Sequence, residues 1–585
     1  MTGLAELLAF LVLLCLVTKP LGAYMADVFE GKPTFGSRVL GPLERLIYRA
    51  CGVSPDVEQR WTAYSGACIA FSLVGFLLFY LLLRWQAYLP FNPQRFGTAL
   101  APEGSTPMTP DLAFNTAVSF MTNTSWQAYG GESTLSYFSQ MSGVCVQSFT
   151  SAAAGIAIAV AMIRGFARQS AGTIGNFWVD ATRSLVYVLL PLSVVGAFAL
   201  CSEGVLQNLH PYRTATTLEG AQQKIGMGPV ASQESIKLLS SDGGGFFNAN
   251  SAHPFENPTP LANFLEMLLI LAIPAALTHT FGKMVKATRQ GWTLLVVMLV
   301  LFGAGCLIAS WSENAGNPAL RAFASGSNME GKEVRFGAAE SALFSVVSTA
   351  SSDGAVNSAH DSFMPLGGLV QLFNMKSGEV VLGGTGSGLV SILLLVLVTV
   401  FIGGLMVGRT PEYLGKKIEG KEMKMVMLSF VATSASMLVF SAASLLVHFP
   451  ASSVWNPPGS PIANLTNTGP HGLSEIFYAN ASAAATNGSA FAGLNANTPW
   501  FNLTLGLGML IGRFMMIVPA LAIAGSLARK KQVPASSGTM PTDGFLFGSM
   551  LMGTIFLVTA LTFLPAFSLG PIAEYYLSQA GALFR

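Results

Sequence analysis

The stretch Ser241-Asp242-Gly243-Gly244-Gly245 follows a short helix-compatible segment and stands between two long apolar runs. Three other places in the chain have the same order of features, and each contains a closely similar triplet. The four triplets are Thr122-Asn123-Thr124, Ser241-Asp242-Gly243, Ser352-Asp353-Gly354 and Thr486-Asn487-Gly488. A unit of helix, half-helix, loop and helix is therefore written four times along the chain.

The composition is that of a protein surrounded by lipid. Hydrophobic residues make up 51% of the 585 residues and charged residues only 10%, which suits a membrane protein better than a soluble one. The formal net charge is +2, so nothing indicates nucleic acid as a partner. The six cysteines form no CxxC pair, and we expect neither a disulfide framework nor a transition-metal site.

Ten apolar runs are long enough to cross a bilayer, whose hydrocarbon core of roughly 30 Å needs about 20 helical residues. They begin near Leu4, Thr62, Met141, Ser184, Pro260, Trp292, Leu389, Met425, Phe501 and Phe545. The predicted fold is an all-α integral membrane protein with an N-terminal helix, four repeats in a pseudo-fourfold arrangement, and a final helix. The expected segments are 1–61 (N-terminal helix and loop), 62–183, 184–290, 291–424 and 425–544 (repeats one to four) and 545–585 (final helix and C-terminus).

Lys and Arg are concentrated in alternate loops, for example in residues 32–60 and 409–424. Cytoplasmic loops of membrane proteins carry such an excess. The loops that contain the four triplets then lie on the outer side, and with ten spans both termini are expected there too.

The segment before each triplet is too short or too polar to span a membrane. These segments are Leu112–Met121, Ser235–Leu239, Ala342–Val347 and Leu473–Ala485. Irregular backbone at membrane depth is tolerated only where protein or a water-filled pathway surrounds it, so we predict four re-entrant half-helices around one cavity. Asp111, Glu340 and Glu475 stand near the start of three of them, where the positive dipole end favours an acidic residue. The negative ends then point at the cavity and favour a cation.

Small and polar residues after each half-helix allow backbone carbonyls to turn inward and replace the hydration shell of an alkali cation. Such residues also occur where membrane helices merely pack closely. The fourfold recurrence of the triplet at the same place in the hydropathy pattern favours an ion filter. A carbonyl filter alone does not decide between potassium and sodium.

Three longer motifs resemble one known family: residues 115–127, the Gly-rich run 243–257, and residues 408–417. They are similar to KdpA, the potassium-binding subunit of the bacterial Kdp potassium-transporting ATPase, and the resemblance covers essentially the whole chain. It implies membership of a superfamily of potassium transporters in which a single chain mimics a four-subunit potassium channel. It also implies location in the bacterial inner membrane.

The resemblance assigns potassium binding to the filter positions and to one polar residue just outside the first filter segment. The implied residues are Thr122, Asn123, Thr124, Gln127, Ser241, Asp242, Gly243, Ser352, Asp353, Gly354, Thr486, Asn487 and Gly488. Asp242 and Asp353 stand where other members of the family carry Asn or Cys. We expect both to turn behind the filter and hold its backbone, since carbonyls normally line such sites.

Two arginines are gating candidates. Arg513 interrupts the apolar run 501–524, and the family pattern places it below the filter, where its charge would obstruct free conduction of potassium. The alternative is a structural ion pair or a snorkelling side chain. The family places Arg409 near a cytoplasmic gating element, and the alternative there is an anchor on the cytoplasmic side.

His360 and Asp361 are expected to cap a loop, in preference to a proton or ion relay. No histidine pairs with another at ligand spacing inside an apolar helix, which argues against a haem or quinone subunit.

The chain contains neither a GxxxxGK[ST] phosphate loop nor an Asp-Lys-Thr-Gly phosphorylation motif, so we expect a non-catalytic subunit that binds no cofactor besides transported K⁺. The resemblance implies a separate P-type ATPase subunit, KdpB, that uses ATP and Mg²⁺ and receives ions through an intramembrane tunnel. It also implies the small subunits KdpC and KdpF and a surround of membrane lipids. Two alternatives stay open: a self-sufficient channel or symporter like the Trk and Ktr proteins, and a membrane scaffold whose re-entrant loops only pack.

Overall fold

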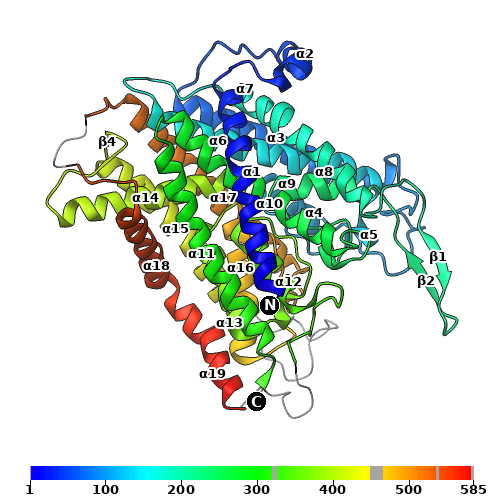
Figure 1. The fold of residues 1–585 in the computed structure, drawn as a ribbon. Helices are drawn as coiled ribbons and strands as arrows, with labels where there is room; N and C mark the ends of the chain where they lie inside the picture. Colours follow the sequence, from blue (N-terminus) through cyan, green and yellow to red (C-terminus); the bar gives the residue numbers. More distant parts are fainter. Residues whose placement is uncertain (1, 319–325, 448–464, 535–538, 582–585) are drawn as a thin grey trace.

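The computed structural model describes residues 2–318, 326–447, 465–534 and 539–581. In these residues ten helical segments are long and apolar enough to cross a membrane, which confirms the predicted number of spans (Figure 1). Their main helices are α1 (Thr2–Phe29), α3 (Trp61–Trp85), α6 (Cys145–Ala167), α8 (Leu190–Ser202), α10 (Pro260–Met284), α11 (Thr288–Asn314), α14 (Ser387–Met406), α15 (Gly420–Leu446), α17 (Pro499–Arg529) and α18 (Phe545–Phe567).

Four shorter helices precede the four triplets. They are α4 (Pro110–Met121), α9 (Val230–Leu239), α12 (Gly337–Ala350) and α16 (Gly469–Ala485). Each begins two to five residues before the predicted half-helix, because the first turns mix small, polar and apolar residues and give no clear boundary signal. In α9 this difference matters, since the predicted start at Ser235 left Glu234 outside the helix.

Threonine followed by proline begins three of the helices. The hydroxyls of Thr109, Thr259 and Thr498 accept hydrogen bonds from backbone N–H groups in the first turns of α4, α10 and α17, at 3.4, 3.0 and 3.3 Å. The proline that follows each threonine has no N–H and so needs no acceptor at the first helical position, where the helix itself supplies none. These caps set where the re-entrant and spanning helices start.

The interior of the protein is formed by α6 and α14, which are buried along most of their length.

Small residues allow α1 and α10 to approach each other closely. The hydroxyl of Thr280 on α10 donates to the carbonyl of Gly22 on α1 at 3.0 Å, and α1 runs alongside α10 (Figure 1). Close contact through small residues is a common way of packing helices in lipid.

The remaining elements are short. They are α2 (Phe35–Cys51), α5 (Gly131–Thr134), α7 (Phe177–Arg183), α13 (Pro365–Lys376), α19 (Ala573–Gln579), and the one- or two-turn segments η1 (Gln86–Tyr88), η2 (Ser139–Val144), η3 (Ser184–Leu189), η4 (Asn250–Ala252), η6 (His360–Ser362) and η7 (Ser568–Ile572). Strands β1 (Arg213–Thr216) and β2 (Gln222–Ile225) pair antiparallel, with Arg213 opposite Ile225, as do β3 (Glu412–Tyr413) and β4 (Lys416–Lys417). The β1–β2 hairpin projects from the edge of the molecule (Figure 1).

Candidate functional site

Each of the four half-helices ends in the same way. One residue adopts the left-handed conformation, and the N–H of the next residue bonds to the carbonyl five positions back. The left-handed residues are Asn123, Ser241, Ser352 and Thr486, with φ of 61°, 44°, 59° and 58°. The bonds run from Thr124 to Ser119, Asp242 to Lys237, Asp353 to Ser348 and Asn487 to Ser482, at 2.9, 3.0, 3.3 and 2.9 Å. The four loops are therefore copies of one backbone design.

This geometry fixes the register between the repeats. Asn123, and not Thr122, lies in register with Ser241, so the residue equivalent to Gly243 is Ser125, which the sequence triplet left out. Thr122 still belongs to the helix end, since its hydroxyl bonds to the carbonyl of Val118 at 2.9 Å. We name the loops loop 1 (122–127), loop 2 (240–245), loop 3 (351–355) and loop 4 (486–489).

The loops contact one another in a closed ring, and glycines make this approach feasible. A Cβ added at Gly243 would lie 2.7 Å from the Cα of Gly354, and one at Gly354 would lie 2.9 Å from the carbonyl carbon of Gly488. A Cβ at Gly488 would overlap the carbonyl oxygen of Thr124. Loop 2 thus meets loop 3, loop 3 meets loop 4, and loop 4 meets loop 1.

Side chains complete the ring between loops 1 and 2. The amide of Asn123 donates to the carbonyl of Ser241 at 2.7 Å, and the hydroxyl of Ser125 donates to the Asp242 carboxylate. Gln127 accepts a hydrogen bond from the N–H of Gly245 at 2.8 Å. The first two loops are therefore held together by hydrogen bonds as well as by backbone contact.

The polar side chains next to the left-handed residues bond to the loops themselves. Asp353 accepts from the N–H of Ala355 at 3.0 Å. Asn487 accepts from the hydroxyl of Ser489 at 2.6 Å and donates to the carbonyl of Ser348 at 3.1 Å. The Asp353 carboxylate therefore bonds to the backbone of its own loop, whereas the Asp242 carboxylate accepts from the side chain of Ser125.

Two cavities border the loops. A vestibule of about 670 Å³ is bounded by residues of all four loops, including Ser125, Gly244, Gly354 and Gly488. A smaller cavity of about 70 Å³ touches Thr486, with Glu379 and Gly512 in its wall. The vestibule thus borders all four loops, whereas the smaller cavity borders loop 4 only.

Arg513 lies behind loop 4. It is 4% exposed, its guanidinium donates to the carbonyl of Ser151 on α6 at 3.0 Å, and its neighbour Gly512 packs against the last turn of α16. In the described part of the chain no carboxylate forms an ion pair with Arg513. The alternative that Arg513 belongs to a structural ion pair therefore finds no support among these residues. Arg409 is instead exposed beyond the end of α14, away from the loops.

The sequence reasoning missed a cluster of buried charges behind loop 2. The Lys237 ammonium lies 2.6 Å from Glu234 and 3.4 Å from Glu256, and all three side chains are buried. Glu256 also accepts from the N–H of Phe247 at 2.6 Å, which anchors the exit of loop 2. Glu234 and Lys237 are three residues apart, which places them side by side on a helix and predicts an ion pair. The sequence shows this pair only if the helix is taken to start before Glu234.

Comparison with known proteins gives a consistent result. The profile of the family described as "KdpA: Potassium-transporting ATPase A subunit" matches residues 8–576. A protein of Solibacter usitatus, named potassium-transporting ATPase potassium-binding subunit, is 56% identical over 583 residues, which cover 100% of this chain and 99% of that protein. A protein of Mesorhizobium japonicum with the same name is 55% identical over 585 residues and covers 100% of both chains.

The fold also resembles a solved structure. The potassium transporter TrkH from Vibrio parahaemolyticus superposes with a TM-score of 0.50 at 15% sequence identity, over 88% of this chain and 96% of that one. This similarity supports the overall helical fold. The family match over nearly the whole chain identifies the protein more closely: it belongs to the family of potassium-transporting ATPase A subunits.

Proposed function

We propose that this chain selects and binds potassium for an ATP-driven uptake complex. The closed ring of loops 1 to 4 carries the proposal, because four contacting loops of one backbone design form the kind of site whose carbonyls replace the hydration shell of K⁺. The names of the 53–56% identical relatives support potassium as the ion. The binding residues we propose are Asn123 to Ser125, Gln127 and the three other triplets, with Thr122 as a support at the helix end.

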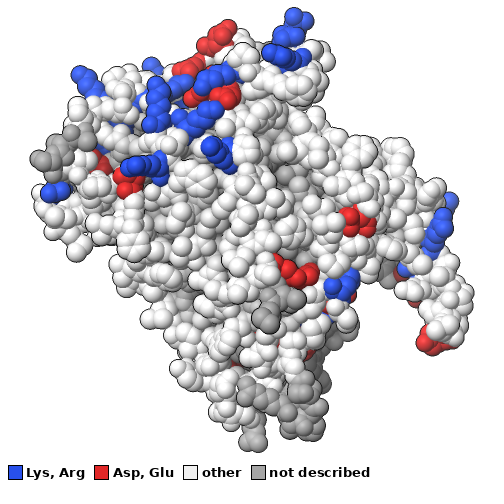
Figure 2. Space-filling view, in the orientation of Figure 1, with Lys and Arg blue, Asp and Glu red and all other residues white. Residues whose placement is uncertain are grey.

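We infer that the ring is loaded from outside the cell. Lys and Arg gather at one end of the molecule, around α2 and β4 (Figure 2), and both chain ends lie at the opposite end (Figure 1). Under the positive-inside rule the basic end faces the cytoplasm of a bacterial inner membrane. The vestibule and both termini then face outward.

The energy source in this proposal is a partner subunit. The chain has no nucleotide-binding motif, and its relatives are named as subunits of an ATPase. We propose a P-type ATPase of the KdpB kind, which uses ATP and Mg²⁺, with KdpC and KdpF as smaller partners. Ions would reach KdpB by way of the small cavity beside loop 4. The similarity to TrkH favours the alternative, a self-sufficient potassium channel or symporter, at the level of fold only.

Titration of ATP hydrolysis separates these functions. In the complex co-purified with this chain, we expect stimulation by low concentrations of K⁺, weaker stimulation by Rb⁺ and none by Na⁺. The lone chain in liposomes should then conduct little potassium. If the rate of ATP hydrolysis does not change with K⁺ concentration and the lone chain conducts potassium rapidly, the channel or symporter is favoured.

Substitution of Arg513 by Gln tests its proposed role as a barrier. Because the guanidinium lies behind loop 4 without a paired carboxylate among the described residues, its removal should lower the electrostatic barrier for cations below the ring. We expect a several-fold increase in passive K⁺ or Rb⁺ leak through the complex, measured as tracer flux without ATP. Arg38→Gln, at an exposed position in α2, should leave the leak unchanged. Equal leak in the native complex and in Arg513→Gln would show that Arg513 is no barrier.

A further inference from the structure

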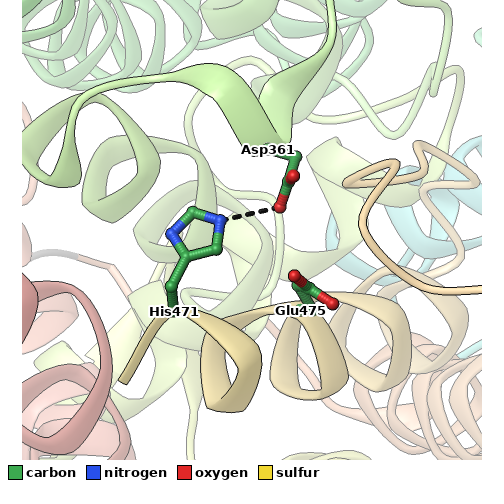
Figure 3. A group of neighbouring side chains, drawn as sticks. All are labelled: Asp361, His471 and Glu475. Atoms are coloured by element: carbon green, nitrogen blue, oxygen red, sulfur yellow. Dashed lines mark hydrogen bonds and ion pairs between the residues drawn. The ribbon is translucent and has the colours of Figure 1, made fainter. Parts of the chain in front are cut away.

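A second polar cluster lies outside the ring, on the face that carries the chain ends. His471 and Glu475 stand on successive turns of α16, and Asp361 in η6 lies opposite them (Figure 3). One ligand atom from each of the three side chains lies within 4.8 Å of the others. The three residues come from the loop after loop 3 and from the half-helix before loop 4.

We propose that Asp361, His471 and Glu475 bind one divalent transition-metal ion, of the class to which Zn²⁺ belongs, and that Glu574 orients the imidazole. One imidazole and two carboxylates form a ligand set that suits such metals, with a fourth position left for water. This departs from the expectation of no transition-metal site. It does not depend on the function proposed for the ring.

The hydrogen bonds of His471 match those of a metal-binding histidine. Its Nε2 lies 2.7 Å from the Asp361 carboxylate, on the side of the cluster, and its Nδ1 lies 2.8 Å from the Glu574 carboxylate. A carboxylate on the second ring nitrogen is the usual partner of a ligating histidine, where it sets the tautomer and the ring orientation. A metal ion would take the place of the Nε2 proton between His471 and Asp361.

Glu475 supplies an oxygen that lacks a partner. Its Oε1 accepts from the backbone N–H and side-chain amide of Asn467 at 3.2 and 3.0 Å. Its Oε2 is buried and has no hydrogen-bond partner among the described residues. A buried carboxylate oxygen without a donor is costly, and a bound cation removes that cost.

Gly493 leaves room for the carboxylates of Glu475 and Asp361, because it has no side chain. A Cβ at Gly493 would lie 2.5 Å from Glu475 Oε1 and 2.7 Å from Asp361 Oδ1. Asp361, His471 and Glu574 also line a pocket of about 110 Å³ through which an ion could enter.

Charge favours a cation as well. Three carboxylates surround one imidazole, and within the described residues His471 is the only basic ion-pair partner of Asp361 and Glu574. The nearby Lys332 ammonium is already paired with Glu313 at 2.9 Å. A dication would offset most of the negative charge of the three carboxylates.

Zinc content tests the site directly. The co-purified complex is stripped with a chelator, incubated with Zn²⁺, desalted, and measured for zinc by mass spectrometry. We expect the native complex to retain one more zinc per chain than Glu475→Gln or His471→Gln. Glu574→Gln should weaken zinc binding about 10–100-fold, as loss of an outer partner does. Glu330→Gln, a matched change of an exposed carboxylate in the wall of the same pocket, should retain the zinc.

Cobalt gives an independent readout. Co²⁺ in the native complex should show the visible absorption of a low-coordinate site, and the spectrum should be absent from Glu475→Gln. Should His471→Gln disassemble the complex on gel filtration, Glu475→Gln decides the question, since it keeps the size of the side chain. Equal zinc content in the native and Glu475→Gln complexes, with no cobalt spectrum in either, would overturn the proposal.

Discussion

Gly488→Ala is expected to abolish high-affinity potassium stimulation of the complex. A Cβ at this position would overlap the carbonyl oxygen of Thr124 in loop 1, and φ is +91°, where an alanine costs about 1–2 kcal/mol. Relief of the overlap must move loop 1 or loop 4 and so open the ring. Since about 1.4 kcal/mol corresponds to a tenfold change in affinity, the K⁺ concentration for half-maximal ATP hydrolysis should rise by about tenfold or more.

Gly303→Ala is the matched control. Gly303 lies in α11, and no atom lies within 4 Å of the position that its Cβ would take. The same chemical change should therefore leave the response to K⁺ unaltered and stabilise the helix by up to about 1 kcal/mol. An unchanged response in Gly488→Ala as well would mean that the contact between loops 1 and 4 has no part in potassium selection.

Lys237→Met is expected to cause the largest loss of stability. The Lys237 ammonium lies between Glu234 and Glu256 and also donates to the Asn250 side chain at 3.1 Å. Removal of one partner from a buried ion pair typically costs about 3–5 kcal/mol, because the remaining charge is left uncompensated. The unfolding temperature of the purified complex should fall clearly, and the half-saturating K⁺ concentration should rise, since Glu256 holds the exit of loop 2.

Two comparisons isolate the charge effect. Lys224→Met, in the exposed strand β2, removes a lysine without a buried partner and should change neither quantity. Lys237→Met combined with Glu234→Gln removes one uncompensated carboxylate and should recover part of the stability. If the double variant is less stable than Lys237→Met, packing and not charge balance explains the loss.

The pH dependence provides a further check on Lys237→Met. Burial raises the pKa of Glu256, which means that its ionised form opposes folding and its protonated form does not. The stability lost in Lys237→Met should therefore be smallest at low pH and should increase as the pH rises through the raised pKa. The same deficit at every pH would exclude an ionised carboxylate as its cause.

Several features followed from the sequence because each depends on residues that are neighbours along the chain. The length of an apolar run predicts a membrane span, so the ten spans were confirmed. The recurrence of short polar triplets after half-helices predicted the four loops and placed Gly243, Gly354 and Gly488 in them. Local patterns determine boundaries less well, and the half-helices begin earlier than predicted because their first turns mix small, polar and apolar residues.

Tertiary structure decided the features that join distant residues. Hydrogen bonds at the end of each half-helix set the register of loop 1 and align Asn123 with Ser241. Comparison of the triplet sequences alone aligned Thr122 with Ser241. Ring closure joins Gly488 to Thr124 across more than half of the chain. The cluster of Asp361, His471 and Glu475, together with Glu574, draws on the three elements η6, α16 and α19. Membrane insertion depends on hydrophobicity summed along a segment, whereas ion binding depends on the positions of individual oxygen and nitrogen atoms, and only the packed chain sets those positions.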